Sequence, residues 1–416
     1  MADYWISTFG GSGDDRGNAL AVDPLGGVYF CGQSPIRGTG GDDALLTKYN
    51  NSGGIEWQRL LGGTGNERGR VVAVDASRNV YVAGFTTSAG AGYDDALIAK
   101  YNSAGALQWQ RMLGGTGYEN AYAMGIDSSN NVYVIGATIV GSPSYDVLIA
   151  KYNSAGTLQW QRTLSSAEAE VGYGGAVDSS GNVYVTGFTA AAGTGYDDAL
   201  IAKYDTNGTL QWQRMLGGSA DDYGYGAAVD SSGNVYVGGY TNSGGNALIL
   251  VKYNSAGTLQ WQRTLRGTGT DVGSGVAVDS SDNVYVVGYT TSEGAGGSDI
   301  LLAKYNSAGT LQWQRLLGGS GSEYGNSVAV DSSGNLYIAG YTTSAGNTNN
   351  ILVAKVPSGG ALTGVYGPFT YAAASLTAST GTLTSSTSAL TSATGTLTGA
   401  TPALTDMDII TTTLVE

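Results

Sequence analysis

The stretch that decides the fold lies between residues 199 and 240. Residues 199–216 read ALIAKYDTNGTLQWQRML and residues 224–240 read GYGAAVDSSGNVYVGGY. Each part holds two apolar-rich runs joined by a polar turn with Gly, the pattern of a β-hairpin. In the DSSGN turn, Asp can accept hydrogen bonds from nearby backbone amides and Gly can adopt a positive φ. The stretch therefore predicts four short antiparallel strands, named here A (AAVD), B (NVYVGGY), C (ALIAKY) and D (TLQWQRML).

The same unit recurs along the chain. Each D strand carries one tryptophan, and successive tryptophans are 52, 52, 51, 52, 49 and 52 residues apart. They are Trp5, Trp57, Trp109, Trp160, Trp212, Trp261 and Trp313. Repeats of this length with four strands each are typical of propeller blades. We therefore expect an all-β fold, a seven-bladed β-propeller with four-stranded antiparallel blades.

The two ends of the repeat array predict how the ring closes. The chain begins with a D-type strand at residues 4–9, and the last repeat ends on a C-type strand at residues 351–356. If the N-terminal strand completes the last blade, no free sheet edge remains at the seam. The expected organisation is a propeller over residues 1–356, a linker over 357–371 and a Thr-rich, short-strand extension over 372–416.

Three motifs carry a family resemblance: STFGGSGDDRGNALAVD at residues 7–23, GNVYVTGFT at 181–189 and DALIAKYN at 95–102. They resemble the bacterial β-propeller repeat known as SBBP, over roughly residues 4–356. The resemblance implies a propeller. It implies little about chemistry, because members of that family are mostly uncharacterised surface or extracellular proteins.

An acidic residue follows each tryptophan by about ten positions. The set is Asp15, Glu67, Glu119, Glu170, Asp222, Asp271 and Glu323. One interpretation is a structural cap for the amides of the tight GGTG-type turns, which need an acceptor. The other is a ring of carboxylates that binds a cation, including weak calcium, or a basic partner. The capping interpretation is the favoured one.

Length differences between the repeats concentrate in the B–C loop. Loops that vary in this way often carry binding surfaces, so the face that bears the B–C loops is the expected contact face. Its candidate ligand- or partner-binding residues are Tyr93, Asp94, Asp95, Tyr145, Asp146, Tyr196, Asp197 and Asp198. A lectin-like propeller would bind glycans here, with one weak site per blade.

The composition argues against catalysis and against nucleic acid. The chain has no histidine, which excludes Ser-His-Asp and Cys-His systems and histidine-based zinc sites. Its paired carboxylates recur in equivalent settings, whereas glycoside hydrolysis needs two carboxylates in different environments. The net charge of −14 repels phosphate backbones. We expect no catalytic residues, no cofactor and no confident metal site, and we expect Cys31 to be a core residue.

A second period appears in the tail, at Leu376, Leu383, Leu390, Leu397 and Leu404. A seven-residue leucine period suggests a coiled coil, but Thr, Ser and Gly are poor helix formers. Three-residue strands separated by turns fit the residues better. Such an array must bury its leucines against another chain or a surface; the alternative is a flexible, low-complexity segment. The tail resembles segments of tailed-bacteriophage virion proteins.

The leading functional hypothesis combines these features. The N-terminus shows no signal-peptide pattern, and no apolar run is long enough to span a membrane. We expect a non-enzymatic virion structural protein, as tail fibre or capsid decoration, whose propeller serves attachment and whose tail anchors it to the particle or to sister chains. The alternatives are an extracellular or cell-surface lectin-like propeller that binds glycans, and an intracellular interaction scaffold.

Overall fold

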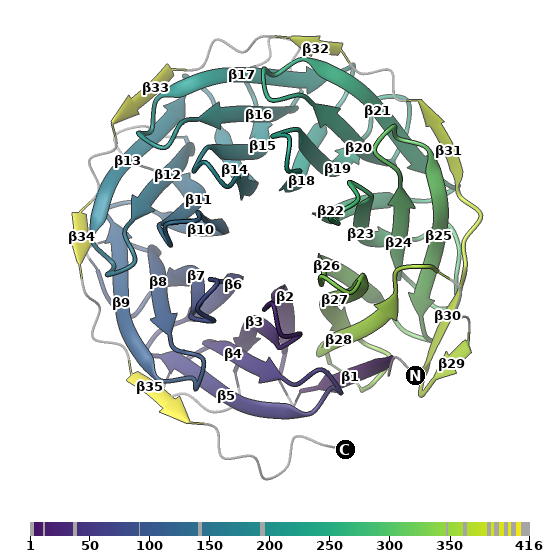
Figure 1. Ribbon diagram of the computed structural model, residues 1–416, viewed down its shortest axis with the longest axis horizontal. Coiled ribbons are helices and arrows are strands. Elements are labelled where there is room, and N and C mark those ends of the chain that lie inside the picture. The colour runs from purple at the N-terminus through teal and green to yellow at the C-terminus, as the bar shows by residue number, and fades with distance from the viewer. Residues whose placement is uncertain are drawn as a thin grey trace.

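The computed structural model describes residues 4–10, 13–35, 40–90, 92–139, 144–191, 196–346, 348–360, 364–380, 384–386, 391–394, 398–400 and 405–408. Seven antiparallel sheets stand around a central axis like blades (Figure 1). The seven-bladed all-β propeller with four repeat-derived strands per blade is confirmed. Within the described residues, no helix is long and apolar enough to cross a membrane.

The four strand types take fixed places in every blade, from the axis outward. The A strands are β2 (Arg16–Val22), β6 (Glu67–Val74), β10 (Glu119–Ile126), β14 (Glu170–Val177), β18 (Asp222–Val229), β22 (Asp271–Val278) and β26 (Glu323–Val330). The B strands are β3 (Val28–Ser34), β7 (Val80–Thr86), β11 (Val132–Thr138), β15 (Val183–Thr189), β19 (Val235–Thr241), β23 (Val284–Thr290) and β27 (Asn335–Thr342).

Two further sets complete the blades. The C strands are β4 (Asp43–Tyr49), β8 (Asp95–Tyr101), β12 (Asp146–Tyr152), β16 (Asp198–Tyr204), β20 (Ala247–Tyr253), β24 (Asp299–Tyr305) and β28 (Asn350–Pro357). The D strands are β5 (Ile55–Gly62), β9 (Leu107–Gly114), β13 (Leu158–Ser165), β17 (Leu210–Gly217), β21 (Leu259–Arg266), β25 (Leu311–Gly318) and β1 (Trp5–Phe9).

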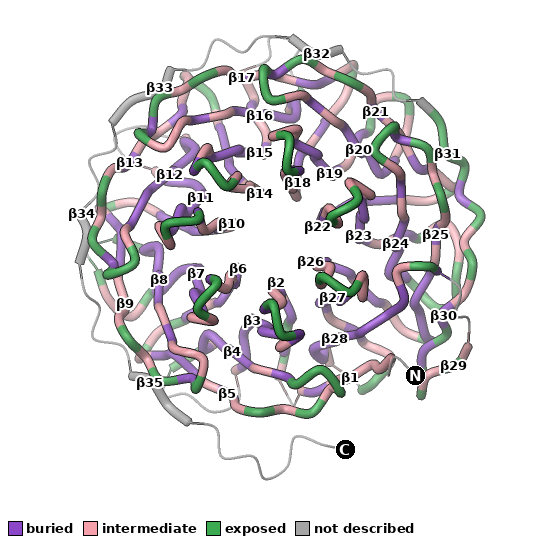
Figure 2. Tube along the Cα trace, viewed as in Figure 1, coloured by how far each residue is buried: buried purple, intermediate pink, exposed green. Residues whose placement is uncertain are grey.

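The hydrophobic core lies between blades rather than at the axis. The B and C strands are buried on both faces, which is why they read as nearly continuous apolar runs, while the turns are exposed (Figure 2). One cluster joins Leu248 and Leu250 of β20 to Val284 and Val286 of β23 in the next blade. Each blade therefore buries its faces only when both neighbours are present. Cys31 is fully buried in β3, as expected.

The ring closes as expected from its ends. Strand β1 pairs antiparallel with β28, with Trp5 opposite Lys355 and Phe9 opposite Ile351. Phe9 joins a cluster that contains residues of both the first and the last blade, among them Phe30 and Tyr337. The N-terminal strand thus ties the two ends of the repeat array together without a disulfide.

A contact between the D strand of one blade and the C–D turn of the next repeats around the ring. In one example, Trp160 Nε1 donates to the Thr206 carbonyl at 3.1 Å and Arg162 Nε donates to the Gly208 carbonyl at 2.8 Å. Gly208 has φ +76°, and a Cβ there would lie 2.9 Å from Trp160 Cδ2. The turn therefore requires Gly both for its conformation and for the approach of the indole. The same pairs are Trp5–Gly53, Trp57–Gly105, Trp109–Gly156, Trp212–Gly257, Trp261–Gly309 and Trp313–Gly360.

The tail returns to the propeller and adds outer strands to its blades. Its strands are β29 (Gly364–Tyr366), β30 (Phe369–Ala373), β31 (Thr377–Thr380), β32 (Thr384–Ser386), β33 (Thr391–Thr394), β34 (Thr398–Ala400) and β35 (Thr405–Asp408). Strands β30 to β35 pair antiparallel with β25, β21, β17, β13, β9 and β5, in reverse blade order (Figure 1). Strands β31 to β35 begin seven residues apart, so one seven-residue step carries the chain from one blade to the next.

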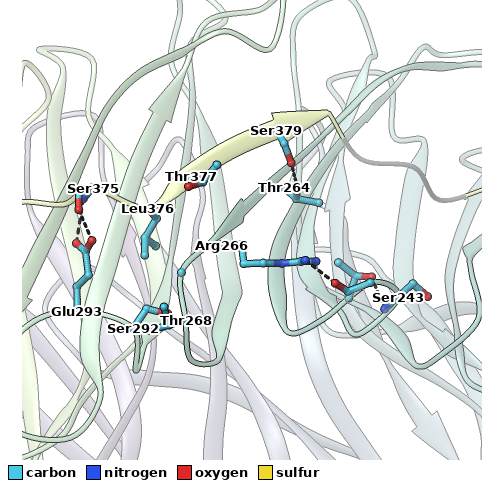
Figure 3. A pocket seen from close by; sticks show the side chains of 13 residues that line it. Ser243, Thr264, Arg266, Thr268, Ser292, Glu293, Ser375, Leu376, Thr377 and Ser379 are labelled. Atoms are coloured by element: carbon cyan, nitrogen blue, oxygen red, sulfur yellow. Dashed lines mark hydrogen bonds between the residues drawn. The ribbon is translucent and has the colours of Figure 1, made fainter.

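Leu376 shows how the tail is held. It is 4% exposed and packs into the cluster that contains Leu265, Leu301 and Leu316. Gln314 Nε2 donates to the Leu376 carbonyl at 2.9 Å. The Ser375 amide beside it donates to the Glu293 carboxylate at 2.9 Å (Figure 3). The surface that buries this leucine is thus the propeller itself. Leu383, Leu390, Leu397 and Leu404 lie outside the described residues, and the predicted anchoring role of the tail stays a prediction. The predicted linker contains β29 and part of β30.

The glycine at the inter-blade contact can be tested with Gly360→Ala. Gly360 has φ +63° and a Cβ there would lie 2.9 Å from Trp313 Cδ2. A left-handed conformation costs a residue with a Cβ about 1–3 kcal/mol, so we expect a loss of that size in the free energy of unfolding by urea. The matched control is Gly359→Ala, whose Cβ would meet no atom within 4 Å. Equal stability of the two variants would contradict the role of this contact.

The attachment of the tail can be tested with Leu376→Ala. Replacing a buried leucine by alanine typically lowers the free energy of unfolding by about 2–5 kcal/mol. Here we expect the loss to weaken the pairing of β31 with β21. We expect faster amide hydrogen exchange in residues 377–380 and 259–266, with the B and C strands unchanged. Leu25→Ala is the control, because Leu25 is 73% exposed. Unchanged exchange at β31 would show that Leu376 does not hold the tail.

Candidate functional site

Every A strand carries a β-bulge at the same step. The extra residue of each bulge is Asn18, Arg70, Tyr122, Tyr173, Tyr225, Ser274 or Asn326. A bulge re-aims the side chain of its extra residue. The A strands surround the axis (Figure 1), and the bulges bring seven side chains of four residue types to one cavity lining. Here the seven-fold symmetry of the backbone is broken by the residues that it presents.

These seven residues line one cavity of about 570 Å³ on the axis. Tyr223, Tyr240, Thr270, Val272 and Tyr289 complete its lining. Tyr240 and Tyr289 lie near the ends of β19 and β23, from which the B–C loops leave. The cavity therefore extends toward the face that the variable B–C loops mark. A second cavity continues along the axis past the bulged residues, toward Val71, Met124 and Val328.

Aromatic rings form a continuous series along one side of this axial cavity. The ring centroids of Tyr122 and Tyr173 are 5.5 Å apart, as are those of Tyr173 and Tyr225. Tyr225 lies 5.8 Å from Tyr223 in a stacked arrangement, and Tyr223 lies 6.4 Å from Tyr240. Mutual contacts of this kind hold aromatic rings in fixed orientations. The series offers a ligand rigid apolar faces with phenolic hydroxyls at their edges.

Arg70 is the one cationic side chain in the lining. Its guanidinium carbon lies 4.9 Å from the Tyr122 ring centroid and 5.3 Å from that of Phe85, which are cation–π distances. Its Nε is buried and has no hydrogen-bond partner. Burial lowers the pKa of Arg70 from its usual value, against the smaller opposing effect of Tyr122.

The tyrosines of the cavity are neutral over the physiological range. Burial is the main cause that raises the pKa of Tyr122, Tyr173, Tyr225 and Tyr289 above the usual phenol value. Neutral phenols donate and accept hydrogen bonds but do not remove protons from a substrate. The arrangement is therefore suited to binding.

The predicted B–C residues take two different places. Tyr93 and Tyr196 are 64% and 48% exposed, and Tyr93 stacks on Tyr118 at 4.6 Å. Asp197 accepts a hydrogen bond from Tyr223 Oη at 2.7 Å, so it belongs to the rim of the axial cavity. Asp94 accepts from Asn120 at 3.3 Å, and the Tyr145 carbonyl accepts from the Glu170 amide at 2.8 Å. Asp197 is thus hydrogen-bonded to the cavity lining, while Asp94 and Tyr145 act on lining residues electrostatically.

The aspartate that begins each of five C strands is buried. Asp95, Asp146 and Asp198 begin C strands, as Asp43 and Asp299 do, and all five are less than 9% exposed. Burial raises the pKa of each to about 6, and the neighbouring acidic residue adds to the shift. Neither carboxylate oxygen of Asp43 has a hydrogen-bond partner. These residues are unavailable as surface ligands.

The acidic ring residues are also buried, at 2% exposure or less. Glu67 is typical: its Oε2 accepts from the Gly63 amide and its Oε1 accepts from Thr86 Oγ1, both at 2.6 Å. Equivalent amide bonds reach Glu119, Glu170, Asp222, Asp271 and Glu323. This geometry is that of a turn cap. Among the described residues, no three acidic side chains form a group that could hold a metal ion, and weak calcium binding stays a prediction.

The bulged residues were missed in the sequence. Three positions after each ring acid the repeats read Asn, Arg, Tyr, Tyr, Tyr, Ser and Asn, while the flanking positions are mostly small residues. Variation at one position within otherwise similar repeats was the available signal. It was overlooked because no rule of strand alternation predicts that a bulge turns this residue toward the axis.

The buried aspartates predict how stability depends on pH. Because the folded pKa of about 6 lies above the unfolded value near 3.8, these groups favour the folded state at low pH, and that contribution is lost as pH rises through 6. Asp43→Asn should therefore raise the melting temperature at pH 8 and leave it nearly unchanged at pH 4. Asn350 occupies the equivalent position in the last blade, so the ring accepts Asn there. A lower melting temperature at pH 8 would contradict this account.

Comparison with known proteins agrees with the repeat architecture. The SBBP beta-propeller repeat model matches residues 211–246, 260–294 and 312–347, and a beta-propeller domain of unknown function, DUF5122, matches residues 280–311. The chain is 32% identical over 111 residues to the regulatory protein FlaEY of Caulobacter vibrioides, a match that covers 24% of this chain and 12% of that protein. It is 26% identical over 209 residues to the uncharacterized WD repeat-containing protein L264 of Acanthamoeba polyphaga mimivirus, covering 40% and 15%.

These matches span only a small part of both relatives. Among solved structures, Sqt1 from Chaetomium thermophilum aligns over 82% of each chain with 13% identity and a TM-score of 0.48. Each matched repeat runs from the D strand of one blade through the A and B strands of the next, so the three matches touch four blades, and the other blades share the same pattern. Three repeats of this chain are thus similar to the SBBP beta-propeller repeat, and the seven-bladed propeller agrees with that similarity.

Proposed function

We propose that the chain is a non-enzymatic recognition protein that binds a glycan in the axial cavity. The observation that supports this most directly is the convergence of seven bulged side chains, of four residue types, on one tyrosine-lined space. Ligand sites are usually cavities of about 300–1,000 Å³ with mostly apolar and aromatic walls and a few polar groups. The cavity volume of about 570 Å³ falls in that range.

The residues of the lining suit a sugar. Tyrosine rings pack against the apolar faces of a pyranose, while their hydroxyls can bond its own hydroxyl groups. Asn18, Ser274 and Asn326 supply further donors and acceptors from the opposite side of the ring of A strands. A small ring-shaped polar ligand would therefore meet stacking surfaces on one side and hydrogen-bonding groups on the other.

Binding without catalysis follows from the same lining. The described residues of the lining include no carboxylate and no histidine, Asp197 lies at the rim with Tyr223 bonded to it, and burial raises the pKa of Tyr173 and Tyr225. General acid–base catalysis needs a group that titrates near the working pH and lies within reach of the substrate. The proposed site therefore holds its ligand unchanged.

Attachment is the role that we propose for this binding, on a virion as the tail resemblance suggests or on a cell surface. The tail strands pair with the outer D strands of the propeller. Anchoring to sister chains would use the same edges, with the tail of one copy on the blades of another. The propeller would then present its axial cavity to the glycan.

Two tyrosine variants test the location of the site. Tyr173 contacts the rings of Tyr122, Tyr225 and Phe188, so Tyr173→Ala should weaken glycan binding about tenfold or more, the loss of about 1.4 kcal/mol expected of a central aromatic contact. Tyr93→Ala is the control, because Tyr93 lies exposed on the outer B–C face. Binding partners come from a glycan array, and affinities from calorimetry.

The outcomes separate the alternatives. Loss of binding in Tyr93→Ala with Tyr173→Ala unaffected would favour outer sites, one per blade. An array without hits would contradict glycan recognition. Depolymerisation of a bound polysaccharide would show that the protein is an enzyme.

A further inference from the structure

We infer that Arg70 makes the axial cavity selective for an acidic saccharide, one whose carboxylate or sulfate group sits on the guanidinium. This inference rests on the proposed function, because it names the chemical class of the ligand for the same cavity. It follows from the contacts of Arg70, from the way its neighbours hold it and from the charge of the rest of the chain.

Arg70 differs from arginines that have partners within the protein. Arg68 pairs with Asp42 at 2.9 Å, and Arg16 pairs with Asp14 at 2.9 Å. The D-strand arginines donate to backbone carbonyls of the next blade, as Arg162 does. Among the described residues, none forms a hydrogen bond or ion pair with the Arg70 side chain, and its buried Nε has no partner. The N–H groups of the Arg70 guanidinium therefore remain able to donate hydrogen bonds to a ligand.

The position of Arg70 is fixed before any ligand arrives. Tyr122 and Phe85 hold its guanidinium at 4.9 Å and 5.3 Å from their ring centroids. Withdrawing a cation from water without a partner is unfavourable, and an anion that reaches it offsets that cost. A guanidinium also matches a carboxylate or sulfate with two parallel hydrogen bonds. The site is therefore prepared for one acidic group beside the Tyr122 ring.

The geometry also orders the ligand. From blade to blade around the axis, Arg70 is followed by Tyr122, Tyr173 and Tyr225. A sugar whose acidic group binds Arg70 would therefore place its ring beside these tyrosine rings. Ser274, Asn326 and Asn18 occupy the remaining three positions. Arg70 would thus decide which sugar binds, and the tyrosines would hold the ring.

The negative net charge of the chain indicates that an acidic saccharide would bind through a local contact with Arg70 and not through long-range attraction to the protein. With a net charge of −14, the protein repels polyanions at long range. An acidic saccharide would bind because one of its groups meets one arginine in a closed environment. Affinity should therefore depend weakly on salt, unlike the steep dependence of a basic polyanion-binding surface.

The test uses matched pairs of tetrasaccharides that differ only by an acidic group: oligoglucose against oligoglucuronate, oligogalactose against oligogalacturonate, and oligogalactose against its sulfated form. The full-length chain and the variants Arg70→Gln, Arg70→Lys and Arg68→Gln are compared by calorimetry at two salt concentrations. Arg68→Gln is the matched control, since Arg68 lies two residues away and is already paired with Asp42. Melting temperatures show that each variant is folded.

We expect the acidic member of at least one pair to bind about tenfold tighter than its neutral counterpart. Arg70→Gln should remove that difference, Arg70→Lys should restore part of it, and Arg68→Gln should leave it in place. Tight binding of neutral and acidic members alike, unchanged in Arg70→Gln, would overturn the inference while leaving glycan recognition standing. If no glycan of either kind binds, both proposals are overturned. If Arg70→Gln does not fold, the comparison of Arg70→Lys with Arg68→Gln decides.

Discussion

The contact between each D-strand tryptophan and the C–D turn of the next blade is the interaction on which the ring depends. The indole can lie on the turn only because Gly provides both the positive φ and the missing Cβ, as at Gly208 beneath Trp160. The arginine two residues later donates to the same turn. No blade covers its own apolar faces, so the tryptophan–turn contact and the core between two blades form together. Pairing of β1 with β28 closes the ring at seven such contacts. The near-identity of the repeats follows from that requirement.

The same constraint explains where the chain is free to vary. Positions in the B and C strands and in the turns are occupied by packing and capping contacts, so a change there disturbs two blades. The bulged residue of each A strand faces the axis, where its contacts with the next blade are made by different groups: rings in the tyrosines, a guanidinium in Arg70, and side-chain amides in Asn18 and Asn326. Arg70 and Tyr122 can thus replace Asn or Ser at that position without altering the ring. This division between a repeated scaffold and a variable axial position is what allows a symmetric fold to carry a single asymmetric site.

Most of the fold follows from the sequence, because its signals are local and repeated: turn residues at fixed offsets, alternating apolar positions and a constant tryptophan spacing. The N-terminal closure follows from the strand types at the two ends. The course of the tail does not, since a threonine-rich strand carries no sign of which edge it will join; only the burial of Leu376 and the seven-residue step reveal the match to the blades. The axial site was also missed. The B–C loops indicate the face toward which the axial cavity extends, but the side chains that reach the axis depend on a bulge that residue alternation does not show.

Ligand binding at the axis, where the repeats differ, is tested most directly by a crystal structure of the protein soaked with an acidic oligosaccharide. We predict one ligand per propeller, with a sugar ring against Tyr173 and its acidic group within hydrogen-bond distance of the Arg70 guanidinium. Ligand density at the exposed outer residues Tyr93 and Tyr196, repeated from blade to blade with the axial cavity empty, would contradict it.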